Sequence, residues 1–562
     1  MAVAQPLNSM DCSALRLYLD KRLQALRNER STWFGHWRDL SDNILPRRGK
    51  FLVTPNESQR GSIKTQRIID NTATLSAGRL AAGIQSGVTS PARPWFRLAL
   101  GDADLSDQSD VKLWLDEVQR RMFRVLGQSN IYNCTHVLYE EVGVFGNGVL
   151  LIEEDDLDVI RGTILTAGEY MLATNNRGRV DVLFREFVMT VEQMSERFGL
   201  ENLSSAAQAL YYTGQMDQQF MIAHAIEPNS TLSDGLPGVV GKKPYRSTYW
   251  EWANREKIVL ECKGFNELPF MAFRWHVIAN EPYGRSPGMD ALGDVKALQK
   301  MQLRSQQAID KMVNPPMVAD IAMKNENASL LPGGVTYVSQ SGAGFKPAYE
   351  ISPNIQGIEQ KIRETQERIK SCFFEDLWMM IAQLDTVRTA TEIVARKEEK
   401  MLQLGPVLER MQFELLDPIV ERVFSIMMRR GLLPPAPQSV QGNQIDVQYV
   451  STLADAQKAV DTTGVERLVA FVGNIAAARP DALDNLNVDE IVDSYADMLG
   501  VSPKVLESTA QVAAIRAQRA KQAQQAQSAQ NAMAAVQGAQ TLSQTDVGGG
   551  QNALEKMGGG IG

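Results

Sequence analysis

Residues 286–430 constrain the fold of this 562-residue chain most, because they predict two long polar helices with a compact insert between them. Pro287, behind the candidate N-cap Ser286, favours a helix start, and Asn314-Pro315 ends that helix. The second helix begins near Asn354, with apolar or small side chains at alternating steps of three and four. A single chain cannot bury two such stalks on all sides. We therefore expect neighbouring copies to pack against them in a ring, and a ring with a hole suggests transport through it.

Composition limits the class of protein. The chain is too long for one core, so about three or four compact units are expected, and its 44% hydrophobic and 22% charged residues are ordinary for a soluble globular protein. It has no run of about 18 apolar residues, so we expect no membrane insertion. Its start has neither a basic nor an apolar signal region, which favours synthesis in the cytoplasm. The net charge of −8 argues against tight DNA binding, although an acidic wall would let DNA pass without sticking.

Catalytic motifs are not found in the sequence. The four cysteines and four histidines are scattered, and neither a Walker A loop nor a Gly-x-Ser-x-Gly elbow occurs. We therefore predict no enzyme activity, no cofactor and no metal site. One acidic run, Glu153-Glu154-Asp155-Asp156 with Asp158, has two interpretations: the solvated end of a hairpin, or a site for a divalent cation.

The first half of the chain predicts a mixed α+β fold with a largely antiparallel sheet. Helical spacing is found at residues 12–45, 70–86, 110–126 and 132–144. Strand patterns follow at 149–152, 162–173, 180–188, 220–226, 247–253, 257–262 and 270–275, with a short helix at 191–198. The turn residues at 175–178 predict a hairpin between the strands at 162–173 and 180–188.

The second half predicts mostly helix. The end of the second stalk, 373–381, is apolar and is expected to enter a core. After a polar break at 384–388, Thr389 and Glu392 form a capping-box pattern that opens another long helix, in which Gly405-Pro406 predicts a kink. Further on, the patterns predict a strand at 445–450, helices up to about 510, and a Gln/Ala-rich helix that gives way to a Gly-rich tail.

Several motifs in this order resemble one family: the portal, or head-to-tail connecting, proteins of tailed bacteriophages, in the version used by short-tailed phages. The resemblance covers about residues 10–470. The motifs that carry it are Ser90-Pro91-Ala92-Arg93-Pro94-Trp95-Phe96, Tyr283-Gly284-Arg285-Ser286-Pro287-Gly288, Arg388-Thr389-Ala390-Thr391-Glu392-Ile393, Leu404-Gly405-Pro406-Val407-Leu408, Leu416-Asp417-Pro418 and Gly431-Leu432-Leu433-Pro434-Pro435.

The resemblance implies an α+β, portal-like subunit that assembles into a twelve-fold ring. Its expected parts are an α+β wing (1–285), a first stem helix (286–313), a small α/β clip (314–353), a second stem helix (354–383), a tunnel loop with a kinked wing helix (384–440), a mainly helical crown (441–510), and a Gln/Ala-rich helical extension with a flexible Gly-rich tail (511–562).

The implied function is a channel at one capsid vertex of the virion, through which double-stranded DNA is packaged and ejected. The implied partners are a large terminase, head-to-tail adaptor or tail proteins, and the major capsid and scaffolding proteins. The implied DNA-facing residues of the tunnel loop are Asp385, Thr386, Val387 and Arg388. The stem residues Lys361, Glu364 and Glu367 are candidates for subunit contacts or channel lining, or form a solvated helix face.

Two other functions fit parts of the sequence. A structural adaptor or scaffold protein without a channel would explain the missing catalytic motifs, but not the ordered motifs of the family. A DNA-processing enzyme would use the acidic run at 153–158 with a divalent cation. An assay for cation-dependent nuclease activity separates the enzyme from both structural functions.

Overall fold

The structure is a computed structural model of the chain. It describes residues 9–51, 65, 67–100, 108–229, 243–252, 254, 256, 259–279, 281–314, 317–318, 321, 346–347, 354–382, 404–440, 445–449, 468–474, 479, 487–488, 490–492, 495 and 509–544. The chain divides into two compact units. The first comprises Met1–Leu98, Val118–Pro435 and Val447–Ala456, and the second comprises Ala99–Glu117, Ala436–Asp446 and Gln457–Gly562.

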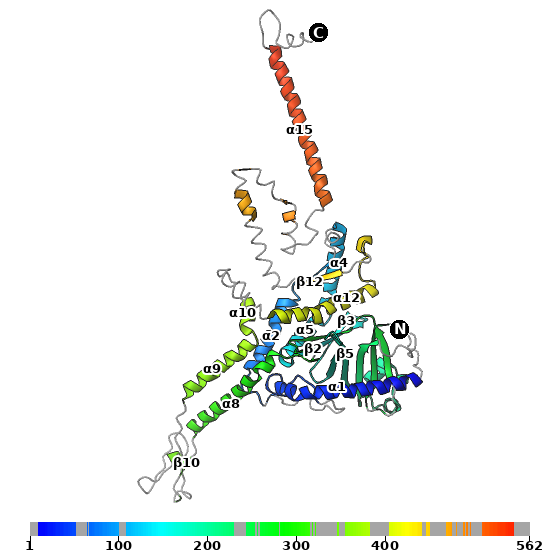
Figure 1. The fold of residues 1–562 in the computed structure, drawn as a ribbon, viewed down its shortest axis with the longest axis vertical. Helices are drawn as coiled ribbons and strands as arrows, with labels where there is room; N and C mark the ends of the chain where they lie inside the picture. The colour runs from blue at the N-terminus through cyan, green and yellow to red at the C-terminus, as the bar shows by residue number, and fades with distance from the viewer. Residues whose placement is uncertain are drawn as a thin grey trace, which may run out of the picture. The chain divides into compact units, whose positions relative to one another are not determined.

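The first unit contains a five-stranded antiparallel sheet, on the right in Figure 1. Its order is β4-β5-β6-β7-β8, formed by Tyr170–Thr174, Val180–Thr190, Gln219–Pro228, Tyr245–Glu251 and Val259–Phe265. Helix α1 (Ser9–Asn43) covers one face. Leu15, Leu19, Leu23 and Leu26 recur every three or four residues and pack onto Phe184 and Trp250 of the sheet. The leucine spacing found in the sequence therefore positions this helix.

Shorter helices cover the other face of this sheet. They are α6 (Val191–Phe198), the 3-10 turn η1 (Leu200–Asn202) and α7 (Ser205–Tyr212). Helix α6 opens with a capping box, in which the Thr190 side chain accepts from the Gln193 backbone and the Gln193 side chain accepts from the Thr190 backbone. Met194 and Phe198 pack against Tyr249. The sheet is thus buried on both faces.

A second, three-stranded sheet has the order β3-β2-β9, formed by Val159–Leu165, Asn147–Asp155 and Phe270–Arg274. Helix α5 (Ile131–Phe145) packs on it, and helix α2 (Thr72–Val88) packs on α5. All pairs in both sheets are antiparallel, so the predicted mixed α+β class with a largely antiparallel sheet is confirmed.

The remaining elements include β1 (Phe96–Leu100), α4 (Ser109–Gln128) and α12 (Asp417–Arg429). Trp95 and Phe96 are buried, and the Phe96 ring lies 4.5 Å from that of Phe123, centroid to centroid. A 3-10 turn η6 (Gln438–Val440) and a strand β12 (Ile445–Tyr449) follow. The predicted Gln/Ala-rich helix is present as α15 (Thr509–Gln544), and its described side chains are exposed or half-buried.

The predicted strand at 162–173 is wrong, because this segment contributes to two sheets. Strand β3 ends at Leu165 and β4 begins at Tyr170. Between them the backbone N–H of Glu169 donates to the Thr166 carbonyl (3.1 Å), and Gly168 has a φ of 91°. The turn was not predicted because apolar residues flank it closely on both sides. Helix α7 was also not predicted.

Glu141 is a buried carboxyl group that joins α5 to this turn. Its side chain is 0% exposed, and it accepts hydrogen bonds from Thr166 Oγ1 (2.7 Å) and from the Ala167 backbone N–H (3.3 Å). Burial raises the pKa of Glu141 from 4.5 to about 7, which outweighs the opposing effects of the Thr166 hydrogen bond and of Arg48. The folded protein therefore keeps this proton at pH values where the unfolded chain releases it.

Glu141→Gln should change how stability depends on pH. Because the folded pKa is raised, the wild-type free energy of unfolding falls as pH rises from about 4.5 to about 7, by up to about 3 kcal/mol from this group. The variant lacks the titrating carboxyl group, so its free energy of unfolding should not fall in this way. Measured by urea unfolding, its stability relative to wild type should therefore rise between pH 4.5 and about pH 7. The exposed Glu192→Gln variant should keep the wild-type slope. Parallel curves for wild type and Glu141→Gln would contradict the prediction.

Candidate functional site

The two predicted stalk helices are the main candidate site. Helix α8 (Pro287–Val313) and helix α9 (Ile355–Cys372) pack side by side and extend away from the sheets toward β10 (Figure 1). As predicted, Ser286 caps α8, and its side chain accepts from the Met289 backbone (3.1 Å). Between the helices, β10 (Met317–Val318) pairs antiparallel with β11 (Lys346–Pro347).

The start of α8 lies against the end of α5. Ser286 Oγ donates to the Val144 carbonyl over 2.6 Å, so one serine caps its own helix and binds the next. A Cβ atom on Gly288 would lie 2.9 Å from both Cα and the carbonyl oxygen of Val144, so the two backbones can approach this closely only at a glycine. The base of the stalk is therefore fixed by backbone contact.

Asp70 joins three helices near this base. Its carboxylate accepts from Gln302 of α8 (3.2 Å), from Gln366 of α9 (2.8 Å) and from the Thr72 backbone at the start of α2 (2.9 Å). Gln299 of α8 accepts from the Asp70 backbone N–H (2.9 Å) and donates to its carbonyl (2.7 Å). Burial alone would raise the pKa of Asp70, but the hydrogen bonds from Thr72, Gln366 and Gln302 outweigh it and lower the pKa. Asp70 is therefore an ionised hub.

Ion pairs add to these contacts. Arg368 of α9 pairs with Asp294 of α8 at 2.8 Å, and Lys296 of α8 pairs with Asp39 of α1 at 2.7 Å. Because all four side chains are about one-third exposed or more, each pair contributes roughly 0–1 kcal/mol. Their effect is to orient the stalk more than to stabilise the fold.

The predicted single helix over 354–383 is wrong at one point, because it breaks between α9 and α10 (Glu375–Ala382). Phe374 has a φ of 55°, a left-handed conformation that no helix contains. After the break, the buried Glu375 accepts from Ser76 Oγ (2.8 Å) and pairs with Arg79 of α2. The predicted burial of the apolar end is confirmed at Phe373, Leu377 and Trp378.

The stem candidates Lys361, Glu364 and Glu367 are exposed on α9. At 3.6 residues per turn Glu364 and Glu367 point away from the buried face of Ile362, Thr365 and Ile369. Lys361 lies one turn before Thr365, at the edge of that buried face. Lys361 and Glu364 form an exposed ion pair at 3.4 Å. These side chains are therefore accessible to solvent in the single chain, which leaves subunit contact, channel lining and a solvated face as predictions.

Other predicted site residues lie outside the described residues or at their margin. Asp385, Thr386, Val387 and Arg388, together with the capping pair Thr389 and Glu392, are outside them. Gly405 and Pro406 lie in the described helical stretch 404–411, at its start, so the kink stays a prediction. Further along, a π turn, η5 (Gln412–Leu416), precedes Pro418, and its Glu414 accepts from the Arg274 backbone (3.0 Å).

The outer half of α8 carries exposed apolar side chains. The inner half buries Ala291, Leu292, Val295 and Leu298, whereas Leu303, Ile309, Met312 and Val313 farther out are exposed, Val313 at 81%. The sequence predicted the helix but not the point at which its apolar side chains become exposed. These residues form a candidate interaction surface.

The acidic run at 153–158 is bound by arginines. Glu153 contacts Arg197 (3.1 Å), Glu154 contacts Arg429 (2.7 Å) and Asp156 contacts Arg430 (3.3 Å). Asp155 accepts from the backbone of Leu157 and Asp158. Within the described part of the chain, no three His, Cys, Asp or Glu residues cluster as they would around a metal ion. In that same part, no helix is long and apolar enough to cross a membrane.

Comparison with known proteins gives consistent matches. The model of the family described as bacteriophage head to tail connecting protein matches residues 16–506. The portal protein of Salmonella phage epsilon15 is 44% identical over 529 residues, which are 93% of this chain and 95% of that protein. The probable portal protein of Bordetella phage BPP-1 is 41% identical over 503 residues, 89% and 90% of the two chains. Among solved structures, one match is a chain in the neck of a native gene transfer agent particle, computed with C12 symmetry. It is 12% identical, and the TM-score is 0.34. The match covers 77% of this chain and 94% of that chain.

Gly83→Ala should loosen the α2–α10 junction at the base of the stalk. The new Cβ would lie 2.8 Å from Trp378 Cβ and closer still to its ring, so α10 must shift. We expect a loss of roughly 1–3 kcal/mol in the free energy of unfolding. Gly78→Ala on the same helix is the control: its Cβ meets nothing within 4 Å, and alanine favours a helix, so stability should stay equal or rise. Equal losses in both variants would contradict this packing.

Proposed function

The chain belongs to the family of bacteriophage head-to-tail connecting proteins, and from this membership we propose that it is the portal protein of a short-tailed phage. It forms a ring at one capsid vertex of the virion. Double-stranded DNA passes through the ring during packaging and ejection. The observation that carries the proposal is the family match over residues 16–506, together with 44% identity to a portal protein along almost the whole chain.

The exposed apolar side chains on α8 support assembly into a ring. Ile309 and Val313 are one helical turn apart and share a face, so a neighbouring α8–α9 pair could cover both. A closed ring repeats one such contact around its axis, so each chain offers two different surfaces. We take the number of copies as twelve, the number that the family resemblance implies.

The parts of the subunit follow the same proposal. Residues 1–285 and 384–440 form the wing, 286–313 and 354–383 the stem, and 314–353 the clip, with the crown at 441–510 and the extension and tail at 511–562. Within this arrangement Asp385, Thr386, Val387 and Arg388 face the DNA as a tunnel loop. Lys361, Glu364 and Glu367 line the channel or contact the next subunit.

The protein acts as a passage and a docking platform, and not as an enzyme. Because the sequence has no Walker A loop, a separate large terminase supplies the ATP hydrolysis and docks at the clip. Head-to-tail adaptor, tail, major capsid and scaffolding proteins are the further partners. The protein is made in the host cytoplasm. The net charge of −8 suits a channel through which DNA slides without being retained by its wall.

Replacing Ile309 and Val313 with glutamate should prevent ring formation without unfolding the chain. The two charges would be desolvated at the subunit contact, whereas in the single chain both positions are exposed. Light scattering and negative-stain imaging should show rings of about 750 kDa, twelve copies of a 62.3 kDa chain, for wild type only. Gln307→Glu, on the opposite side of α8, should still form rings. Normal rings from the double variant would rule out this contact surface.

Arg388→Glu tests the tunnel loop. Reversing one charge per subunit places twelve new negative charges around the passing DNA, so packaging or retention of DNA should fall while rings still form. The measurement is the amount of DNA protected in particles assembled with the variant, with negative-stain imaging of the purified rings. Full packaging and normal retention would show that Arg388 does not face the DNA.

A further inference from the structure

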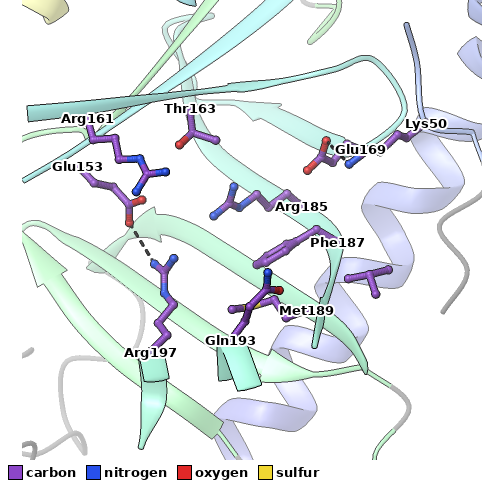
Figure 2. Close-up of a pocket in the computed structure, with 11 residues that line it drawn as sticks. Lys50, Glu153, Arg161, Thr163, Glu169, Arg185, Phe187, Met189, Gln193 and Arg197 are labelled. Carbon is purple, nitrogen blue, oxygen red and sulfur yellow. Dashed lines mark hydrogen bonds and ion pairs between the residues drawn. The ribbon is translucent and has the colours of Figure 1, made fainter. Parts of the chain in front are cut away.

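A cavity of about 510 Å³ lies beside the junction of the two sheets (Figure 2). Strands β2 and β3 contribute Glu153, Arg161 and Thr163, while β5 contributes Arg185 and Phe187. Arg197 of α6 completes the end at which Glu153 lies. Cavities of this size bind small molecules in many proteins. None of the contacts proposed for the ring uses it.

The cavity lining carries more positive than negative charge. Lys50, Arg161, Arg185 and Arg197 face two carboxylates, Glu153 and Glu169, which leaves an excess of two positive charges. Lys50 and Glu169 pair with each other at 3.4 Å. The other end therefore has three guanidinium groups and one carboxylate. Glu153 contacts Arg197 at 3.1 Å and lies directly opposite Arg161 in the β2–β3 ladder.

Arg185 has no carboxylate partner among the described residues, although it is only 6% exposed. Its Nε donates to His224 Nδ1 (3.0 Å), and its Nη2 contacts the Tyr249 hydroxyl (3.4 Å). Its guanidinium points into the cavity, where Nη1 makes no hydrogen bond to the described part of the chain (Figure 2). A buried positive charge without a counter-ion is costly, so this group points to an anionic ligand.

His224, the neighbour of Arg185, is uncharged. The ring is buried and stacks on Tyr249 at 3.7 Å, centroid to centroid, and its Nε2 contacts Ser247 Oγ at 2.8 Å. Burial lowers the pKa of His224 well below its ordinary value, and the neighbouring Arg185 and Arg197 lower it further. The imidazole is therefore neutral at pH 7, and its Nδ1 positions Arg185 by accepting the hydrogen bond from Arg185 Nε.

We propose that this cavity binds a free divalent oxyanion of the phosphate class, between Arg161, Arg185 and Arg197. Two negative charges would balance the excess of the lining. Guanidinium groups suit the ligand because their N–H groups can donate in pairs to the oxygens of a phosphate. Thr163 adds a hydroxyl donor to the cavity lining. The site lies within one subunit and needs no ring to form.

Isothermal titration of inorganic phosphate into the full-length protein, at constant ionic strength kept with KCl, tests the site. We expect one phosphate per chain. Arg161→Gln and Arg185→Gln should each weaken binding about tenfold or more, because each removes a charged hydrogen-bond donor. Arg177→Gln, which removes the same charge from an exposed turn outside the cavity, should bind as wild type does. Acetate should bind at least about tenfold more weakly, since it carries one charge and two oxygens.

Several outcomes would overturn the proposal. They are no phosphate binding by wild type, equal binding by all three variants, or acetate binding as tight as phosphate binding. If Arg185→Gln does not fold, Arg161→Gln decides alone, because Arg161 is exposed and its loss leaves no buried gap. Ring formation is measured separately, so failure here leaves the proposed portal function untouched.

Discussion

The backbone contact between the first turn of α8 and the last turn of α5 is the constraint on which the stalk depends. Gly288 lets the backbones of the two helices approach, and Ser286 joins the helices with a hydrogen bond to the Val144 carbonyl. Helix α5 in turn lies on the three-stranded sheet and against α2. The direction of the stalk is thus set by the helices and sheet that precede residue 286. The Asp70 hub and the Asp294–Arg368 pair then fix α9 beside α8.

Buried charges join segments that are distant in sequence. Arg274 of β9 binds Glu414 in the π turn, and Arg422 of α12 binds Glu267 at 2.6 Å. These contacts attach the helices after residue 404 to the sheets of the first half. Removing one partner of such a pair leaves a buried charge alone, which costs more than the pair itself contributes. The π turn at Gln412–Leu416 brings Glu414 to the backbone of β9, so the irregularity in the helix has a packing role.

Local patterns predicted much of the fold because they act over a few residues. Ser286-Pro287 started α8, the leucine spacing defined α1, and the turn at 175–178 formed the expected hairpin of β4 and β5. The break at Phe374 could not be predicted, because long-range burial of Phe373 and Glu375 imposes a conformation that phenylalanine rarely adopts. The Asp70 hub brings together residues more than 200 positions apart, and Arg185 looked like any strand residue. Family motifs indicated the portal class, but the predicted tunnel-loop residues 385–388 lie outside the described residues.

Because α8 is long, a small change of angle at its base produces a large displacement of its far end. A helix of 27 residues is about 40 Å long, so a rotation of one degree at Ser286 displaces its far end by about 0.7 Å. The contacts among Ser286, Gly288 and Val144 therefore limit the angle of α8. In the proposed ring, that angle decides whether the far ends of neighbouring copies meet.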